Sequence, residues 1–403
     1  MTLLPALLGL LGDRINKLTI PVIGRSQARF DEQRPGGFWD TLSRGVMKAP
    51  LISMVLAAGL LIAATIPFFD IKTGASGVSS FPEGIDSKDA LLILDEEFSA
   101  GEATPAEIVI EGDIDSPAVQ TAVGRLRVTL AGDEVFGRLR DLEVSPDATV
   151  AALVVSVAGD SVSKVTVDAI KRLRSEYVPG AFQGVPAEVY VTGETAFNID
   201  FFDIANNAAF VVIPFVLAIS FILLMLVFCS VVVPLKAIIL NLLSVGATYG
   251  ILVLIFQKGK GNDLFGFHQA ETIEAWIPVF LFAILFGLSM DYHVFLLSRI
   301  RERFDRTQDN TGSVAYGVRS TGRLITGAAL IMVAVFWGFA AGDLGGLQQM
   351  GFGLGLAVLV DATIVRIVLV PASMKFLGKW NWYLPSWLEW LPDLRVEVEP
   401  TEA

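Results

Sequence analysis

Cysteine and histidine are scarce in this chain of 403 residues. The single cysteine, Cys229, excludes an internal disulfide and a cysteine-based metal cluster, and the two histidines leave little for a histidine-rich metal site. No G-x-x-x-x-G-K-S/T loop is present, which argues against ATP-driven transport by this polypeptide. No catalytic constellation is recognisable either. We therefore expect neither an enzyme nor a bound metal or cofactor.

Charged residues are also few. They make up 18% of the chain against 53% hydrophobic residues, a composition too apolar for an ordinary soluble protein. Asp70 to Asp203 holds twenty-four acidic and ten basic residues, whereas Met1 to Lys48 holds seven basic and four acidic. The positive-inside tendency then puts the acidic block outside and both termini in the cytoplasm. The sequence predicts a multi-pass protein of the cell (plasma or inner) membrane.

Six apolar stretches are long enough to cross a bilayer as helices. One precedes the acidic block and five follow it between residues 205 and 376. The predicted spans are residues 49–69, 208–228, 234–256, 276–297, 324–341 and 350–374. The fold class is therefore a polytopic α-helical membrane protein with an extracytoplasmic domain, residues 70–204, between its first and second helices.

The outer domain alternates between strand and helix patterns. Period-two stretches predict strands, and stretches with helical spacing predict helices, in the order β-α-β-β-α-β. That order suits a ferredoxin-like sandwich, in which both helices cover one face of an antiparallel sheet. The predicted elements are residues 107–111, 116–130, 139–144, 150–157, 162–177 and 188–192.

A carboxylate lies inside the fourth predicted span, in residues 287–302. Asp291 comes eight residues before Arg299, which at 1.5 Å per residue puts it roughly 12 Å from the basic end of the helix. A charge at that depth costs about 2.5–3.5 kcal/mol even on lenient insertion scales, so a functional role is favoured. Gly287, one turn earlier, would let another helix approach closely, and Tyr292 adds a hydroxyl. A structural hydrogen bond between helices is the alternative.

The motif G-x-S-x-D-Y, followed by L-L-S-R-I-R-E, resembles the tenth transmembrane helix of MmpL-type transporters in the resistance-nodulation-division (RND) superfamily. The resemblance implies a proton-driven exporter of hydrophobic or lipid substrates, with Asp291 and Tyr292 as its proton relay. It also implies two six-helix halves, each with an outer porter domain. The chain would then be the second half, and the counterpart Asp-Tyr pair would lie in the missing N-terminal half or in a partner subunit.

The start of the chain repeats its last membrane helix. The two segments share a pattern with the same spacing. The first is Thr2-Leu3-Leu4-Pro5-Ala6 followed by Leu11-Gly12, and the second is Val368-Leu369-Val370-Pro371-Ala372 followed by Leu377-Gly378. We therefore expect residues 1–12 to be the tail of a preceding transmembrane helix and residues 13–48 to be a cytoplasmic linker. Chance similarity is the alternative. Whether the chain forms a homo-oligomer stays open.

Other polar residues of the spans are candidate relay partners. Thr326 would reach the depth of Asp291 by antiparallel packing, although back-bonding to its own helix fits equally well. Asp361 and Arg366 point about 140° apart on an α-helix, so a simple intrahelical pair is disfavoured. Arg366 could bias Asp291 or pair with Asp361 across a bend. Gly351 and Gly355 form a close-packing G-x-x-x-G face.

Three further features of the membrane region favour structural roles. His293 lies two residues past Asp291 and faces away from it, so we expect it outside the relay. Arg299 belongs to the cytoplasmic motif and could contact lipid phosphate or a carboxylate, or snorkel. One face of the third span carries polar residues suited to helix-helix contacts, namely Asn241, Ser244 and Thr248.

The C-terminal residues 377–403 predict an interfacial or cytoplasmic tail. Their four tryptophans suit a membrane interface rather than a nucleic-acid or cofactor stacking site. Two rival functions remain. SecD/SecF-type translocation subunits also have six helices and an outer domain, but Ala-Asn is expected of SecD after the acid, where this chain has Tyr-His. A Patched-like, sterol-sensing scaffold would bind a partner without transport.

Overall fold

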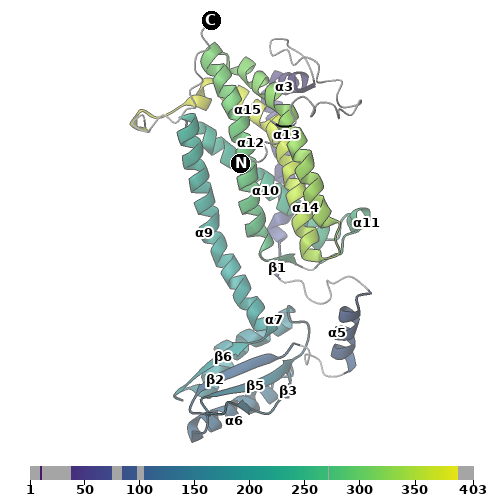
Figure 1. Cartoon of the computed structure of the whole chain (residues 1–403), viewed down its shortest axis with the longest axis vertical. Helices are drawn as coiled ribbons and strands as arrows, with labels where there is room; N and C mark the ends of the chain where they lie inside the picture. Colours follow the sequence, from purple (N-terminus) through teal and green to yellow (C-terminus); the bar gives the residue numbers. More distant parts are fainter. Residues whose placement is uncertain (1–9, 11–37, 75–83, 98–103, 271, 389–403) are drawn as a thin grey trace.

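The structure is a computed structural model that describes residues 10, 38–74, 84–97, 104–270 and 272–388. Two parts are visible in Figure 1: a bundle of long helices, and an α/β unit that we call the sheet domain (residues 104–193). One continuous helix, α9, runs from the sheet domain into the bundle (Figure 1). The repeat predicted at residues 1–12, and most of the linker 13–48, lie outside the described residues.

Six helices of the described chain are long and apolar enough to cross a membrane, and each contains one of the six predicted spans to within one residue. The chain is therefore a polytopic helical membrane protein. A shorter helix, α3 (Phe38–Lys48), precedes them. The spans are Pro50–Asp70 (α4 and η2), Glu194–Phe228 (α9), Val232–Gln257 (α10 and η5), Ile277–Thr307 (α12), Asn310–Ala340 (α13) and Gly345–Trp382 (α14, η6, α15 and η7).

The second span begins earlier than predicted because α9 (Glu194–Phe228) starts in the core of the sheet domain. Its first turn follows Gly193, whose φ of 111° ends the preceding strand. Ala196 and Ile199 are buried among the apolar side chains of the sheet domain. The helix thus continues for 35 residues without a break, and the apolar stretch used for the prediction is only its second part.

The sheet domain has strands in the order β3-β5-β2-β6, all antiparallel, with β4 paired to β5. Side chains alternate between buried and exposed along β2, so one face of the sheet is covered. Ser116 and Ser163 cap α6 and α7 by accepting backbone N–H bonds, which fixes where these helices begin. The elements are β2 (Ala106–Gly112), α6 (Pro117–Ala131), β3 (Phe136–Leu139), β4 (Glu143–Val144), β5 (Val150–Val157), α7 (Lys164–Arg172), η4 (Leu173–Tyr177), α8 (Val178–Phe182) and β6 (Ala187–Thr192).

The predicted strand at residues 139–144 is wrong in its bounds. The register against β5 shifts between Phe136 and Leu139, and pairing resumes only at Glu143. An irregular ladder of this kind splits one strand into two short pieces. The other predicted strands and both helices of the domain are present within a few residues of their expected ends.

Short contacts tie the sheet domain's entry to the bundle. After η2 (Ile66–Asp70), the strand β1 (Thr73–Gly74) pairs in parallel with β7 (Ile273–Glu274), just before α12. Lys258, after η5 (Val253–Gln257), forms an ion pair with Asp70. Gln349 of α14 (Gly345–Val360) accepts the Glu274 N–H at 3.0 Å. The connecting helices α5 (Asp86–Glu97) and α11 (Asn262–Phe265) complete this region.

Glycines set the closest helix contacts of the bundle. A Cβ on Gly250 of α10 would overlap the carbonyl of Ala64 in α4. Gly351 and Gly355 of α14 both face α13: a Cβ at Gly351 would lie 2.5 Å from the Phe336 carbonyl oxygen, and one at Gly355 would meet the Trp337 ring. Backbones approach closely at such positions because there is no side chain between them.

Candidate functional site

A buried ion pair lies in the middle of the helix bundle. Arg366 Nη2 and Nε donate to Asp361 Oδ2 at 2.7 and 2.9 Å, and the two side chains are 2% and 10% exposed. Both belong to η6 (Asp361–Leu369), which is a π-helix. A π-helix has wider turns with i→i+5 spacing, so residues five apart share a face. The α-helical argument against this pair is therefore wrong.

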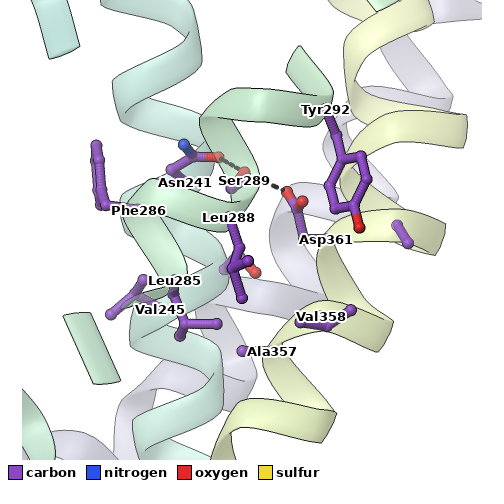
Figure 2. Close-up of a pocket in the computed structure, with 12 residues that line it drawn as sticks. Asn241, Val245, Leu285, Phe286, Leu288, Ser289, Tyr292, Ala357, Val358 and Asp361 are labelled. Carbon is purple, nitrogen blue, oxygen red and sulfur yellow. Dashed lines mark hydrogen bonds between the residues drawn. The ribbon is translucent and has the colours of Figure 1, made fainter. Parts of the chain in front are cut away.

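Two neighbouring helices contribute to the pair. Ser289 of α12 lies within hydrogen-bond distance of Asp361 Oδ1, at 3.0 Å, and of Asn241 Oδ1 from α10, at 2.8 Å. The Ser289 carbonyl accepts from Arg366 Nη2 at 2.5 Å. Figure 2 shows Asn241, Ser289 and Asp361 in one line across three helices. The pair is thus held at both its acidic and its basic ends.

Tyr292 closes the site on the other side. The Arg366 guanidinium lies 4.9 Å from the centre of the Tyr292 ring, a cation–π contact. The Tyr292 hydroxyl donates to Met332 Sδ of α13 at 3.3 Å. One residue of the D-Y motif therefore touches the buried cation directly.

Asp291 points away from this network. It is exposed on the flank of α12, as is Gly287 one turn before it. A Cβ at Gly287 would meet nothing within 4 Å in the described part of the chain. Asp291 and Asp361 are thus separate acids: one is exposed beside Tyr292, and the other is buried with Arg366.

A small cavity of about 20 Å³ lies beside the ion pair, between α10, α12 and α14. Ser289 and Asp361 face it together with apolar side chains such as Leu285 and Val358 (Figure 2). Ser244 also lines it. The amide nitrogen of Asn241 has no hydrogen-bond partner among the described residues. The cavity is large enough for one water molecule, and its few polar groups lie on the side of Ser289 and Asp361.

The remaining predicted site residues lie around this centre or away from it. Thr326 is half-buried and shares a cavity of about 10 Å³ with Arg366. Arg299 is an exposed residue that pairs with Glu302 at 3.0 Å. His293 is fully buried in the bundle. Asn241, Ser244 and Thr248 are all buried, as their shared face predicts.

Ser289 was not recognised from the sequence as a site residue, although it is the third letter of the G-x-S-x-D-Y motif. Its spacing of two from Asp291 puts it on the opposite side of α12, which here is the buried side. A serine two positions before an exposed acid on an apolar helix was the available signal. Its link to Asp361 could not be predicted without the π-helical turn.

The site can couple protonation to helix packing. Because Asp361 and Arg366 compensate each other inside an apolar bundle, removal of either charge leaves the other unpaired at a cost of about 3–5 kcal/mol. The contacts of Arg366 with Ser289 and Tyr292 extend that dependence to α12. Arg366 therefore connects η6 to α12 through direct contacts.

These features define a multi-pass membrane protein with a charged centre inside its helical core, the class that includes ion-coupled transporters. The chain belongs to the MMPL family, whose model matches residues 75–390. It is therefore of the MmpL type within the RND superfamily, as the motif around Asp291 predicts.

Three curated relatives illustrate the family. The chain is 35% identical over 98% of its length to the mycolic acid-containing lipids exporter MmpL11 of Mycolicibacterium smegmatis, covering 41% of that protein. It is 34% identical over 87% of its length to the heme uptake protein MmpL11 of Mycobacterium tuberculosis, covering 36% of it. It is 28% identical over 96% of its length to the trehalose monomycolate exporter MmpL3 of Mycolicibacterium smegmatis, covering 41% of it. The chain thus spans less than half the length of these relatives.

Proposed function

We propose that this chain is one half of a proton-driven membrane exporter of hydrophobic or lipid-like substrates, with Asp291 and Tyr292 as its proton relay. The observation that supports it most is the position of Asp291: a carboxyl at mid-depth of a membrane-length helix, exposed on the flank of the bundle. A carboxyl that faces lipid at this depth is energetically costly, so we expect another helix to cover it. A functional role would explain why the residue is kept there. The exporter names of two relatives agree with this direction of transport.

Asp291 acts through its neighbours in this proposal. Protonation neutralises the carboxyl beside Tyr292, and the Tyr292 ring contacts Arg366. The change in charge then alters how firmly Arg366 holds Asp361 and the Ser289 carbonyl, and with them the packing of η6 against α12. A ligand or proton shifts such an equilibrium only by its different affinity for the two states.

The second half of the machine supplies the partner surface. A counterpart Asp-Tyr helix, in the same polypeptide or in a partner subunit, would cover the exposed face that carries Gly287 and Asp291. The open space beside Gly287 suits the close approach of such a helix.

The sheet domain is, in this proposal, a ferredoxin-like porter domain outside the cell membrane. Its strand order β3-β5-β2-β6 and its single covered face support that assignment. The Arg-rich end of α12, which carries Arg299, Arg301, Arg303 and Arg306, would then face the cytoplasm together with both termini. Movement of the bundle would reach the porter domain through α9 and through the β1–β7 pair.

A transport measurement with an acid variant tests the proposal. In membrane vesicles of the source cells, an imposed pH gradient should drive proton movement, and the cells should carry exported lipid on their outer surface. Asp291→Asn should lower both by at least about tenfold, because the amide keeps the shape but cannot take up a proton.

Asp305→Asn is the matched control. Asp305 belongs to the same helix, but it lies at the Arg-rich end in an exposed pair with Arg301 at 2.9 Å. It should keep at least about half of the activity, since exposed pairs contribute little. Full activity of Asp291→Asn would exclude Asp291 as the relay, whereas the absence of both activities in the unmodified protein would favour a non-transporting scaffold.

A further inference from the structure

His293 is the buried polar group that the proposed relay does not use. It is 0% exposed, one helical turn after Ser289 on the interior face of α12. Within the described ranges, neither ring nitrogen has a hydrogen-bond partner. The Ser289 carbonyl lies near the ring, and it already accepts from Arg366. Each unsatisfied buried polar group costs about 1–3 kcal/mol, so this ring calls for an explanation.

Two cations face the ring from neighbouring helices. Arg366 reaches the Ser289 carbonyl, so its guanidinium lies at the turn leading to His293. Lys236 of α10 is buried, and it acts electrostatically on His293 as Arg366 does. Because α10 and α12 run in opposite directions and Asn241 meets Ser289, Lys236 lies roughly 7.5 Å further toward the Arg-rich end, level with His293.

Polar groups continue from Lys236 to the Arg-rich end. Lys236 Nζ donates to Asn381 Oδ1 at 3.4 Å, and Ser230 Oγ donates to the Asn381 carbonyl at 2.7 Å. Asn381 in turn donates to the carbonyls of Met374 and Gly378 at 2.8 and 2.7 Å. It belongs to the short helix η7 (Gly378–Trp382), which follows α15 (Val370–Leu377). The buried polar groups therefore reach the last turns of the sixth span.

Much of the surrounding layer in the described chain is apolar. The hydrophobic cluster that holds Leu296 and Leu297 of α12 draws its other buried side chains from the surrounding helices. These include Leu61 of α4, Leu224 of α9, Ile325 of α13 and Val370 of α15. The charges that face His293 are thus Arg366 and Lys236, with Asp361 behind Arg366. We name the line of Ser289, His293, Lys236 and Asn381 the polar stripe.

We propose that the polar stripe holds ordered water and is the route by which protons pass between the Asp361–Arg366 site and the Arg-rich end of the bundle. The hydration stands on the geometry, and the proton role rests on the proposed function. Arg366 Nη1, which has no partner in the described chain, and the two ring nitrogens of His293 offer binding positions. A buried water typically makes two to four hydrogen bonds.

His293 is a positioning residue in this route. A neutral imidazole has one donor and one acceptor, so it can hold a water molecule on each side. A proton taken from one water at the acceptor nitrogen is matched by release of the other ring proton to the next water. The ring regains its first tautomer by turning over between transfers, and its net charge is unchanged after each cycle.

Cysteine accessibility tests the hydration without any transport assay. In a Cys229→Ser background, His293→Cys should react with a small water-soluble methanethiosulfonate in native membranes at least about tenfold faster than Leu281→Cys. Leu281 is the matched control: it is also 0% exposed on α12, but it belongs to the apolar cluster nearer the sheet domain. Equal rates would overturn the proposal.

A second variant tests the hydration in case the His293→Cys protein does not fold. Leu240→Cys keeps the imidazole and lies one turn from Lys236 on the same face of α10. It too should react at least about tenfold faster than Leu281→Cys, because it borders the same water. A rate equal to that of the control would contradict a hydrated stripe.

Proton movement in vesicles tests the role of the ring. His293→Leu should slow it about tenfold, whereas His293→Gln, which keeps a donor and an acceptor, should retain at least about half. Equal loss in both variants would mean that His293 is merely structural. Absence of proton movement in the unmodified protein would remove the proton role together with the proposed function, while the labelling rates still decide the hydration.

Discussion

Two aspartate–arginine pairs in this protein have nearly the same geometry and opposite surroundings. In the sheet domain, Arg172 Nη2 lies 2.9 Å from Asp133, with side chains 37% and 15% exposed. In the bundle, Arg366 Nη2 lies 2.7 Å from Asp361, with side chains 2% and 10% exposed. The first pair is open to bulk solvent, and the second is buried inside the bundle. The comparison teaches that losing one partner of the same contact costs little at the surface and much inside the bundle.

Breaking the buried pair should have the largest effect. Arg366→Met leaves Asp361 without its cation in an apolar bundle, so the free energy of unfolding should fall by about 3–5 kcal/mol. Thermal unfolding of the purified protein in detergent measures this. The double variant Asp361→Leu/Arg366→Met removes both charges and should recover most of the loss. A double variant as unstable as the single one would contradict the account.

Two glycines compare how closely the helices of the bundle and of the sheet domain are packed: Gly351 in α14 and Gly124 in α6. Gly351→Ala should destabilise by about 1–3 kcal/mol, because its Cβ would lie 2.5 Å from the Phe336 carbonyl. Gly124→Ala in the sheet domain should instead stabilise by up to about 1 kcal/mol, because a Cβ there meets nothing within 4 Å of described structure in α6. Unfolding in denaturant measures both. A change of the same sign at the two positions would contradict the difference.

The pH dependence of stability tests the exposed pair of Asp133 and Arg172. Partial burial alone would raise the pKa of Asp133, but bonds from Arg172, the Val135 N–H and Tyr177 outweigh it and lower the pKa below its usual value of 3.8. A lowered folded-state pKa means that the pair stabilises above pH 4 and loses this contribution as pH falls through the folded-state value.

Asp133→Asn should therefore remove a small acid-dependent part of the stability, about 1 kcal/mol or less for a pair of this exposure. Unfolding between pH 7 and pH 2, read from a spectroscopic signal of the sheet domain, measures it. An Asp133→Asn protein with the same acid dependence as the unmodified one would show that another carboxyl is responsible.

Asp291, the exposed acid of the membrane region, gives the smallest expected effect on stability. Asp291→Asn should change the free energy of unfolding of this chain by no more than about 0.5 kcal/mol, because Asp291 is exposed and Asp361 is not. The same detergent unfolding as for Arg366→Met applies. A loss of several kcal/mol would mean that Asp291 has a structural partner and is not a free relay carboxyl.

Much of the fold follows from the sequence because length and apolarity decide membrane spans. All six spans are in place, and the strands around Ile108 and Leu153 follow from alternation. The start of α9 did not follow, since residues such as Asp200 and Asp203 are polar and only tertiary packing of Ala196 and Ile199 extends the helix into the sheet domain.

The site was partly predictable. A charge within an apolar helix is conspicuous, so Asp291, Asp361 and Arg366 could each be singled out from cost alone. Their arrangement could not be, because an α-helical repeat places Asp361 and Arg366 apart and only the π-helical winding of η6 brings them together. The hydrogen bonds of Ser289 depend on three helices at once and have no local signal.

One consequence of the long helix α9 is mechanical. At 1.5 Å per residue, its 35 residues form a rod of about 53 Å that is anchored in the sheet domain at one end and in the bundle at the other. A tilt of about five degrees at the bundle end would carry the far end by roughly 5 Å, so small changes in helix packing become large displacements of the sheet domain. Pro214 lies within this rod and removes one of its backbone hydrogen bonds, which makes it the natural point for the rod to flex. The stiffness of α9 on either side of Pro214 thus determines how far the sheet domain moves for a given tilt in the membrane bundle.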